Sequence, residues 1–199
     1  MKRVLLPLAP GFEEIEAVAV IDILRRAGIE VVVAAVAENP AAGSHGISVL
    51  CDVPAAGVDA SRFDALVLPG GMPGTRRLGE SAAVREWVTA MAAAGKLVAA
   101  ICAAPTVLDA CGVLAGRRAT SHPNHAAEMR TCHYEETAVV CDGTFITSRG
   151  AGTAIAFAAA LVTELAGADA ARDILAKILY GPTGTSPRRP RSSTPHDSR

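Results

Sequence analysis

The sequence predicts an α/β fold in which helices cover a mostly parallel sheet, and three observations point to it. Hydrophobic residues make up 50% of the 199 residues and aromatic residues only 4%, so the core must be built from Ala, Val, Leu and Ile. Short apolar runs alternate along the chain with segments of helical period, which is typical of parallel strands joined by helices. Several helical segments stop at a glycine, a common helix terminator.

The first two-thirds of the chain follow this alternation closely. The run "RVLLPLA" is short and apolar and predicts a buried strand, while Ile15, Val18 and Ile23 recur at helical spacing before Gly28. β-Branched residues mark the second strand, and Ser81 is placed to cap a later helix. The expected elements are strand 3–9, helix 13–27, strand 30–37, an added hairpin or edge strand at 46–51, strand 64–71, helix 82–94, strand 97–101 and helix 103–111.

After residue 116 the pattern changes. The stretch "RRATSHPNHAAEM" predicts a short strand followed by a short helix. Two strands are expected around Asp142-Gly143, because Asp-Gly is the strongest short hairpin signal in the chain. An Ala-rich helix at 152–166 ends at Gly167, and an amphipathic helix follows at 169–180.

Composition divides the chain into one α/β domain at 1–180 and a tail at 181–199. The tail is rich in Pro, Ser, Thr, Gly and Arg and has almost no apolar residues, so we expect it to be disordered. It is basic, whereas the domain is mildly acidic. Four arginines without interleaved aromatic residues do not predict nucleic-acid binding.

Several protein classes are excluded by these patterns. No apolar run is long enough to span a membrane, and Pro7, Pro10 and the following glutamates interrupt the N-terminal run too early for a secretory signal. The cysteines are odd in number and never spaced as C-x-x-C, which argues against a disulfide framework or a thiolate zinc site. A reducing cytoplasm suits them best. The five stand at 51, 102, 111, 132 and 141.

Functional residues are expected where strands end, because ligands of open α/β sheets bind beyond the carboxyl ends of the strands. Cys102 stands where "KLVAAICAAP" turns from strand pattern to helix pattern, so its sulfur is expected near the amino end of the next helix, where a thiolate is stabilised. The alternative is a small apolar residue in a turn of the core. The position favours a nucleophile, whereas the other four cysteines fit the core.

Three further groups complete a candidate active site. Backbone N–H groups of Gly70, Gly71 and Ala103 are expected to form an oxyanion pocket, although a plain tight turn is an equal alternative for the glycines. Glu16 lies on the side of Ile15 and Ala19, away from a solvent-facing Glu13. Burial there raises the pKa of a carboxyl group and lets it hold a proton.

His122, in "TSHPNH", is the best-placed general base, ahead of His125 and His133. Taken alone, Glu16 and His122 each fit a structural role as well.

In combination, these segments resemble the ThiJ/PfpI superfamily, specifically its Parkinsonism-associated protein deglycase branch. The resemblance runs through nearly all of residues 1–180. It rests on "GFEEIEAV", "DILRRAGIEV", "LPGGMPG", "ESAAVREW", "AAICAAP", "TSHP" and "DGTFITSRGAGT", which stand in the family's order and spacing.

The resemblance implies a flavodoxin-like (class I glutamine amidotransferase-like) three-layer sandwich that forms a homodimer. Cys102 matches the reactive cysteine, Glu16 the protonated glutamate that bonds it, and His122 the neighbouring histidine. The backbone donors match Gly70, Gly71 and Ala103. Arg26 and Arg149 resemble arginines of the dimer interface or site edge.

The implied activity is glutathione-independent conversion of methylglyoxal or glyoxal to 2-hydroxy acids, with reported deglycation of early glycation adducts. No metal or organic cofactor is required.

Two departures from the family pattern concern substrate preference. The chain has Ser44-His45-Gly46 where relatives often read "SRG", and "RGAGT" where "RGPGT" is usual. Two other functions remain open: a redox sensor or chaperone acting through oxidation of Cys102, and a peptidase or amidase, which ranks last because it requires a better-aligned Cys–His pair.

Overall fold

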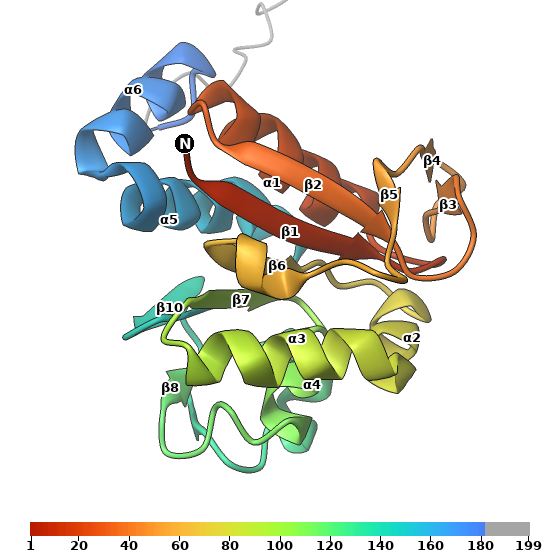
Figure 1. The fold of residues 1–199 in the computed structure, drawn as a ribbon. Helices are drawn as coiled ribbons and strands as arrows, with labels where there is room; N and C mark the ends of the chain where they lie inside the picture. Colours follow the sequence, from red (N-terminus) through yellow and green to blue (C-terminus); the bar gives the residue numbers. More distant parts are fainter. Residues whose placement is uncertain (182–199) are drawn as a thin grey trace, which may run out of the picture.

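A seven-stranded sheet forms the centre of the computed structural model, which describes residues 1–181 (Figure 1). The strands lie in the order β10-β11-β7-β6-β1-β2-β5, and all neighbours are parallel except β10 and β11. The predicted α/β fold with a mostly parallel sheet is confirmed. The strands are β1 (Arg3–Leu8), β2 (Glu30–Ala35), β5 (Val53–Pro54), β6 (Ala65–Leu68), β7 (Leu97–Ile101), β10 (Val139–Asp142) and β11 (Phe145–Ser148).

Helices cover both faces of this sheet and make it the middle of three layers (Figure 1). Successive side chains of a strand point to opposite faces, so β1 sends Val4, Leu6 and Leu8 into one core and Leu5 into the other. The first core contains α1 (Glu14–Arg26), α5 (Ala154–Ala166) and α6 (Ala168–Lys177), and the second contains α2 (Gly74–Glu80), α3 (Ala82–Ala93) and α4 (Pro105–Ala110).

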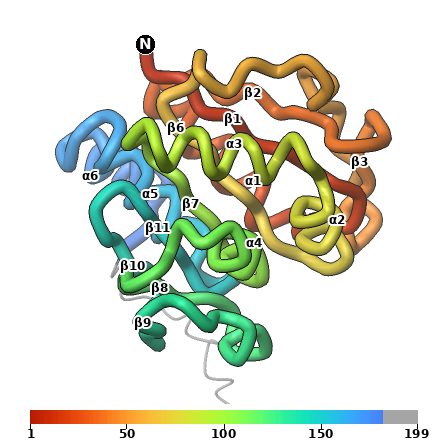
Figure 2. The backbone as a smooth tube through the Cα atoms, turned by 60° about the horizontal axis from the view of Figure 1, so that its bottom comes forward, coloured from red at the N-terminus to blue at the C-terminus, as the bar shows by residue number. Residues whose placement is uncertain are grey.

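Small elements decorate the two sides of the sandwich. The segment expected as an added hairpin or edge strand forms a hairpin, in which β4 (Ser48–Val49) pairs with β3 (Ala41–Ala42). The edge of the main sheet is β5, which the sequence did not predict. A second small sheet joins β8 (Arg118–Ala119) to β9 (His133–Tyr134), and Figure 2 shows this segment beside α4. Within residues 1–181 the short 3₁₀ helices are η1 (Ala60–Arg62), η2 (Pro123–Glu128) and η3 (Ala151–Thr153).

Most remaining sequence predictions agree with the structure to within a few residues. The Asp142-Gly143 hairpin is present as β10 and β11, with Gly143 at a φ of 59°. The short helix after β8 is the 3₁₀ helix η2, and the last helix ends at Lys177. Helix α2 was missed because its sequence, GTRRLGE, contains two glycines and a single large apolar residue, Leu78.

One prediction about helix α1 is wrong. Ile15 and Val18 were expected on its buried face, but they are 57% and 45% exposed. The face packed on the sheet carries Ala17, Val20 and Leu24 instead. An apolar stripe therefore remains on the surface of α1.

Two further predictions, on membrane spans and on the C-terminal tail, concern residues that the structure describes only up to Gly181. Among residues 1–181 no helix is long and apolar enough to cross a membrane. The basic tail predicted at 181–199 lies outside the described residues, except for Gly181.

Candidate functional site

Four adjacent strands bring the candidate residues to one edge of the sheet. In the order β11-β7-β6-β1, the segments after their carboxyl ends supply Gly150, Cys102, Gly70 and, in the first turn of α1, Glu16. A Cβ atom built on Gly150 would lie 3.5 Å from His122 Cδ2, 3.9 Å from Cys102 Sγ and 4.0 Å from Glu16 Oε1. The three predicted catalytic side chains therefore surround one point.

Cys102 has a backbone conformation that is unusual for its residue type. Its φ is 65°, in the left-handed region that L-residues other than Asn and Asp seldom adopt. Two backbone hydrogen bonds hold this turn: Cys102 N–H donates to Ser148 O at 2.9 Å, and His122 N–H donates to Cys102 O at 2.7 Å. The half-buried thiol is thereby fixed next to the strand ends.

Glu16 is fully buried, and only one of its carboxyl oxygens has an oxygen or nitrogen partner. Oε2 accepts a hydrogen bond from Gly70 N–H at 2.8 Å, while Oε1 is the oxygen that faces Gly150. Burial raises the pKa of Glu16 to about 7, against the lowering effect of its hydrogen bonds with Cys102 and Gly70. Near neutral pH this carboxyl group can hold or release a proton.

Cys102 departs from the sequence expectation in its acidity. Burial, followed by the charge and hydrogen bond of ionised Glu16, raises the pKa of the thiol to about 12. The backbone N–H groups of Gly71 and Ala103 lower it by a smaller amount. The expectation that the next helix stabilises a thiolate is wrong for the net effect. Burial and the neighbouring carboxylate raise the pKa of the thiol by more than those N–H donors lower it.

The predicted oxyanion pocket is also corrected. Gly71 and Ala103 direct their N–H groups at the sulfur, but the N–H of Gly70 is already bonded to Glu16. Gly70 instead leaves room for the side chains of Cys102 and Glu16, because a Cβ atom at this position would lie 2.6 Å from both Cys102 Cβ and Glu16 Oε2. Gly71 has a φ of 90°, which favours glycine.

His122 reaches the site by its Cδ2–Nε2 edge. Its Nδ1 accepts a hydrogen bond from Asn124 N–H at 3.2 Å, which assigns the ring proton of the neutral imidazole to Nε2. In this tautomer the Nε2–H of the histidine faces the site as a hydrogen-bond donor. The other candidates lie elsewhere: His125 bonds Glu128, and His133 is exposed on β9.

Glu13, which the sequence analysis placed in solvent, contributes to the electrostatics of the site. It is half-buried and caps α1, accepting the N–H of Glu16 at 2.8 Å, and its charge raises the pKa of Glu16. The signal available in the sequence was its position directly before the helix, three residues from Glu16.

Both arginines suggested by the resemblance have structural partners. Arg26 pairs with Asp22 at 2.6 Å and stands about 15 Å along the axis of α1 from Glu16. Arg149 donates to Glu136 O at 3.0 Å.

His45, the departure from the family pattern, bonds the buried Glu14 through both its backbone N–H and its ring Nδ1. Burial raises the pKa of Glu14, but the hydrogen bonds from His45 outweigh it and lower the value to about 2. Among the described residues, Glu13, Glu14 and His45 place potential metal-ligand atoms within 4.8 Å of one another. Direct bonding between Glu14 and His45 accounts for this cluster.

Comparisons with known proteins find relatives that cover most of this chain. Residues 2–164 match the model of the DJ-1/PfpI family. Protein dj-1beta of Drosophila melanogaster is 41% identical over 181 residues, covering 89% of this chain and 97% of that protein. The glutathione-independent glyoxalase DJR-1.2 of Caenorhabditis elegans is 35% identical, covering 87% and 94%. The solved structure of oxidized Toxoplasma gondii DJ-1 superposes with a TM-score of 0.88 at 39% identity, covering 91% of this chain and all of that one.

Proposed function

Because the chain belongs to the DJ-1/PfpI family, we propose that it converts methylglyoxal or glyoxal to 2-hydroxy acids without glutathione, with Cys102 as nucleophile. Early glycation adducts of the same aldehydes are proposed as further substrates. The observation that carries the proposal is the convergence of Cys102, Glu16 and His122 around the space beside Gly150. The name of the Caenorhabditis elegans relative supports the same reaction class.

The first step depends on one proton shared by Cys102 and Glu16. While Glu16 is ionised, its charge opposes a thiolate. Moving the thiol proton to Glu16 removes that charge and turns the carboxyl group into a hydrogen-bond donor, so it then supports the thiolate. The transfer is uphill, because the pKa of the thiol is about 12 and that of Glu16 about 7, and the N–H groups of Gly71 and Ala103 stabilise the thiolate that it forms.

The thiolate then attacks the aldehyde carbon of methylglyoxal and forms a carbon–sulfur bond, giving a hemithioacetal. The N–H groups of Gly71 and Ala103 border the sulfur and are the donors available to the oxygen that becomes negative. His122 donates a hydrogen bond from its Nε2–H to a substrate oxygen.

Next, the hydrogen on the former aldehyde carbon leaves as a proton, and the neighbouring carbon gains a proton. Carbon 1 is thus oxidised to a thioester while carbon 2 is reduced to an alcohol, with no external oxidant. Water hydrolyses the thioester, releasing lactate and restoring the thiol. We assign the proton transfers between the carbons to Glu16 and His122.

Intact-mass spectrometry of single-turnover mixtures tests these assignments. We expect His122→Ala to accumulate a covalent adduct of one methylglyoxal on Cys102, because attack precedes the transfer it serves. Glu16→Ala lacks the group that takes the thiol proton, so it should form this adduct more slowly than wild type. Cys102→Ser should accumulate none. His133→Ala, which changes an exposed histidine on β9, is the matched control. Full lactate turnover by Glu16→Ala and His122→Ala would contradict their assigned roles.

A second candidate function is oxidation sensing at the same sulfur. It is favoured by the donors around Cys102 and by the relative solved in an oxidized state. Two peroxide molecules would convert the thiol to sulfenic and then sulfinic acid, each giving up one oxygen and leaving as water. Mild peroxide should add two oxygens to wild type and none to Cys102→Ser; oxidation spread over the other cysteines would count against this role.

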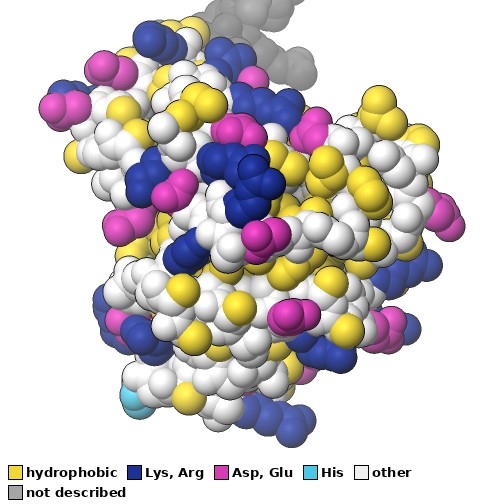
Figure 3. Space-filling view, in the orientation of Figure 1, with side chains coloured by type: hydrophobic (Ala, Val, Ile, Leu, Met, Phe, Trp, Pro, Cys, Tyr) yellow, Lys and Arg dark blue, Asp and Glu magenta, His cyan; other side chains and the backbone are white. Residues whose placement is uncertain are grey.

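We also propose that the working unit is a homodimer in the cytoplasm. Exposed apolar side chains gather on α1 and beside β4: Ile15, Val18, Ile47 and Leu50. The β3–β4 hairpin lies against the start of α1, since Ser44 N–H donates to Phe12 O at 2.8 Å. Figure 3 shows hydrophobic surface over the β3–β5 region. Such a patch is typical of a subunit interface. Sedimentation should therefore give a dimer for wild type and a monomer for Val18→Glu, and a monomeric wild type would contradict the proposal.

A further inference from the structure

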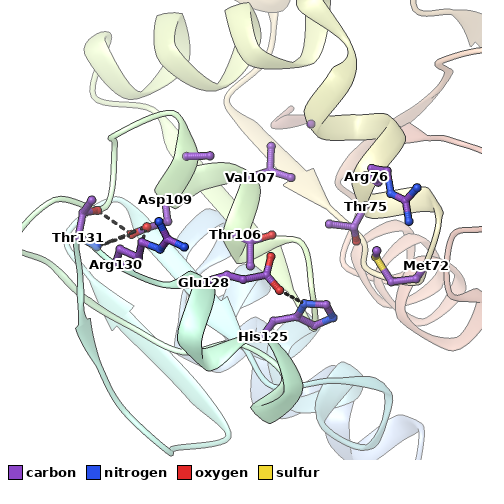
Figure 4. A pocket seen from close by; sticks show the side chains of 12 residues that line it. Met72, Thr75, Arg76, Thr106, Val107, Asp109, His125, Glu128, Arg130 and Thr131 are labelled. Carbon is purple, nitrogen blue, oxygen red and sulfur yellow. Dashed lines mark hydrogen bonds and ion pairs between the residues drawn. The ribbon is translucent and has the colours of Figure 1, made fainter.

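A separate cavity lies beside the catalytic crevice, between α2, α4 and the segment 125–131 (Figure 4). Its volume is about 650 Å³. Met72, on its wall, directly follows Gly71, and Thr106 donates to Ala103 O at 2.7 Å. The ring of His125, also on the wall, has its centroid 6.3 Å from that of His122. The cavity therefore adjoins the oxyanion donors and the catalytic histidine without containing Cys102.

This cavity is larger than a molecule of methylglyoxal requires. Cavities of several hundred Å³ accommodate molecules much larger than methylglyoxal, which has five non-hydrogen atoms. Its apolar lining, which includes Met72 and Val107, suits a short carbon chain. An aldehyde bound at Cys102 could thus extend its far end into this space.

One wall carries a polar group without a partner. Thr75 is 4% exposed, and its Oγ1 has no hydrogen-bond partner among the described residues. A threonine on a helix usually bonds a carbonyl of the preceding turn, whereas Thr75, on the cavity wall, keeps its buried hydroxyl unpartnered. It is available to donate to a ligand oxygen.

Two arginines of the cavity wall are available to bind an anion. Arg76 and Arg130 stand on opposite walls, both exposed, and neither guanidinium makes an ion pair within residues 1–181 (Figure 4). The two acids of the wall are already occupied. Asp109 accepts the N–H groups of Arg130 and Thr131 and the hydroxyl of Thr131, and Glu128 bonds His125 at 2.7 Å.

We propose that this cavity is a substrate subsite that binds a carboxylate or phosphate at the far end of a larger 2-oxoaldehyde. Arg76 and Arg130 attract the anionic group, and the hydroxyl of Thr75 donates to one of its oxygens. The preferred substrates of the enzyme are then acidic 2-oxoaldehydes rather than methylglyoxal. This inference rests on the proposed function for its chemistry, but anion binding itself does not require turnover.

Kinetics with paired substrates test the preference. The acid 4,5-dioxopentanoate and its uncharged methyl ester differ only at the far end, and a 2-oxoaldehyde phosphate monoester forms the second arm. We expect wild type to favour the acid over the ester by about tenfold or more in kcat/KM. The double variant Arg76→Gln/Arg130→Gln should lose this preference. Equal use of acid and ester by wild type would overturn the proposal.

Arg172→Gln is the matched control, since it removes one exposed positive charge on α6. It should retain the preference for the acid. Loss of the preference in this control would assign it to overall charge instead of the subsite and would also overturn the proposal.

Calorimetry separates failure of the subsite from failure of the proposed function. Glutarate and glycerol 3-phosphate carry the anionic groups without an aldehyde and are titrated into the Cys102→Ser protein. Binding that weakens at least about fivefold in the Arg76→Gln/Arg130→Gln background, and also on Thr75→Val, supports the subsite even where no lactate forms. The tighter of the two probes identifies carboxylate or phosphate as the preferred group. Binding of neither, or binding unchanged by these substitutions, refutes it.

Discussion

Replacing Gly70 by alanine tests the packing of the proposed catalytic pair. The added Cβ would stand 2.6 Å from Cys102 Cβ, 2.6 Å from Glu16 Oε2 and 2.9 Å from Ile101 O. Atoms at these separations must move apart. Because one of them is the backbone of β7, the side chains of Cys102 and Glu16 must take up most of the movement.

The structure sets the size of this effect. Overpacking a filled site costs about 1–3 kcal/mol, which lowers the melting temperature of a chain of this length by about 2–12 °C. Displacing the thiol and the carboxyl group by a fraction of an ångström to 1 Å should reduce kcat for methylglyoxal by about 100-fold. The 2.8 Å hydrogen bond from Gly70 to Glu16 is expected to lengthen as well.

The assay compares Gly70→Ala with Gly152→Ala by calorimetric melting and by lactate formation. A Cβ at Gly152 meets nothing within 4 Å, so this control should change neither property appreciably. Wild-type melting and turnover in Gly70→Ala would show that Cys102 and Glu16 are not held as described, and would refute the reasoning.

Three further predictions concern charge and buried hydrogen bonds. Burial raises the pKa of Glu16 from 4.5 to about 7, so its contribution to stability is present below pH 4.5 and falls by about 3 kcal/mol as the pH rises through 7. Denaturant unfolding should show this loss in wild type and not in Glu16→Gln. The hydrogen bond to Glu14 raises the pKa of His45 above 6.5, so this contact weakens as the pH rises through the raised value. Hydrogen exchange of the 43–47 amides should therefore accelerate toward alkaline pH in wild type beyond the intrinsic rate, and not in His45→Arg. Asp109→Ala, which leaves the N–H groups of Arg130 and Thr131 without their acceptor, should lower the free energy of unfolding by about 2–4 kcal/mol, and an unchanged urea midpoint would contradict this.

The sequence predicted the layers of the fold and the location of the site because both depend on local patterns. The run "LVAAI" ends where the pattern turns helical, so the strand end at Cys102 was visible without a structure. The parallel order of four strands then brings Glu16, Gly70 and Gly150 to the same edge. Their roles in catalysis remain predictions.

What the sequence missed depends on contacts between distant segments. The apolar spacing of α1 does not reveal whether a stripe packs on its own sheet or remains on the surface, so Ile15 and Val18 were assigned to the wrong face. The N–H of Gly70 was expected to be free, but Glu16, 54 residues earlier, accepts it. Nothing in the pattern around Thr75 indicated that this residue lines a cavity and leaves its hydroxyl without a partner.

The balance of charge at the active site also required the structure. A cysteine before a helix predicts an acidic thiol, whereas burial of the thiol and, after it, the carboxylate of Glu16 raise its pKa instead. The sequence contains both residues but not their distance. The proposed catalysis consequently depends on where one proton resides, on Cys102 or on Glu16.

The most direct test of the central claim is steady-state formation of D- and L-lactate from methylglyoxal without glutathione, by wild type and by Cys102→Ser. Circular dichroism should first show that both proteins are folded. The account predicts sustained lactate production by wild type and none above the uncatalysed rate by Cys102→Ser. Equal turnover by the two proteins, or none by folded wild type, would contradict it.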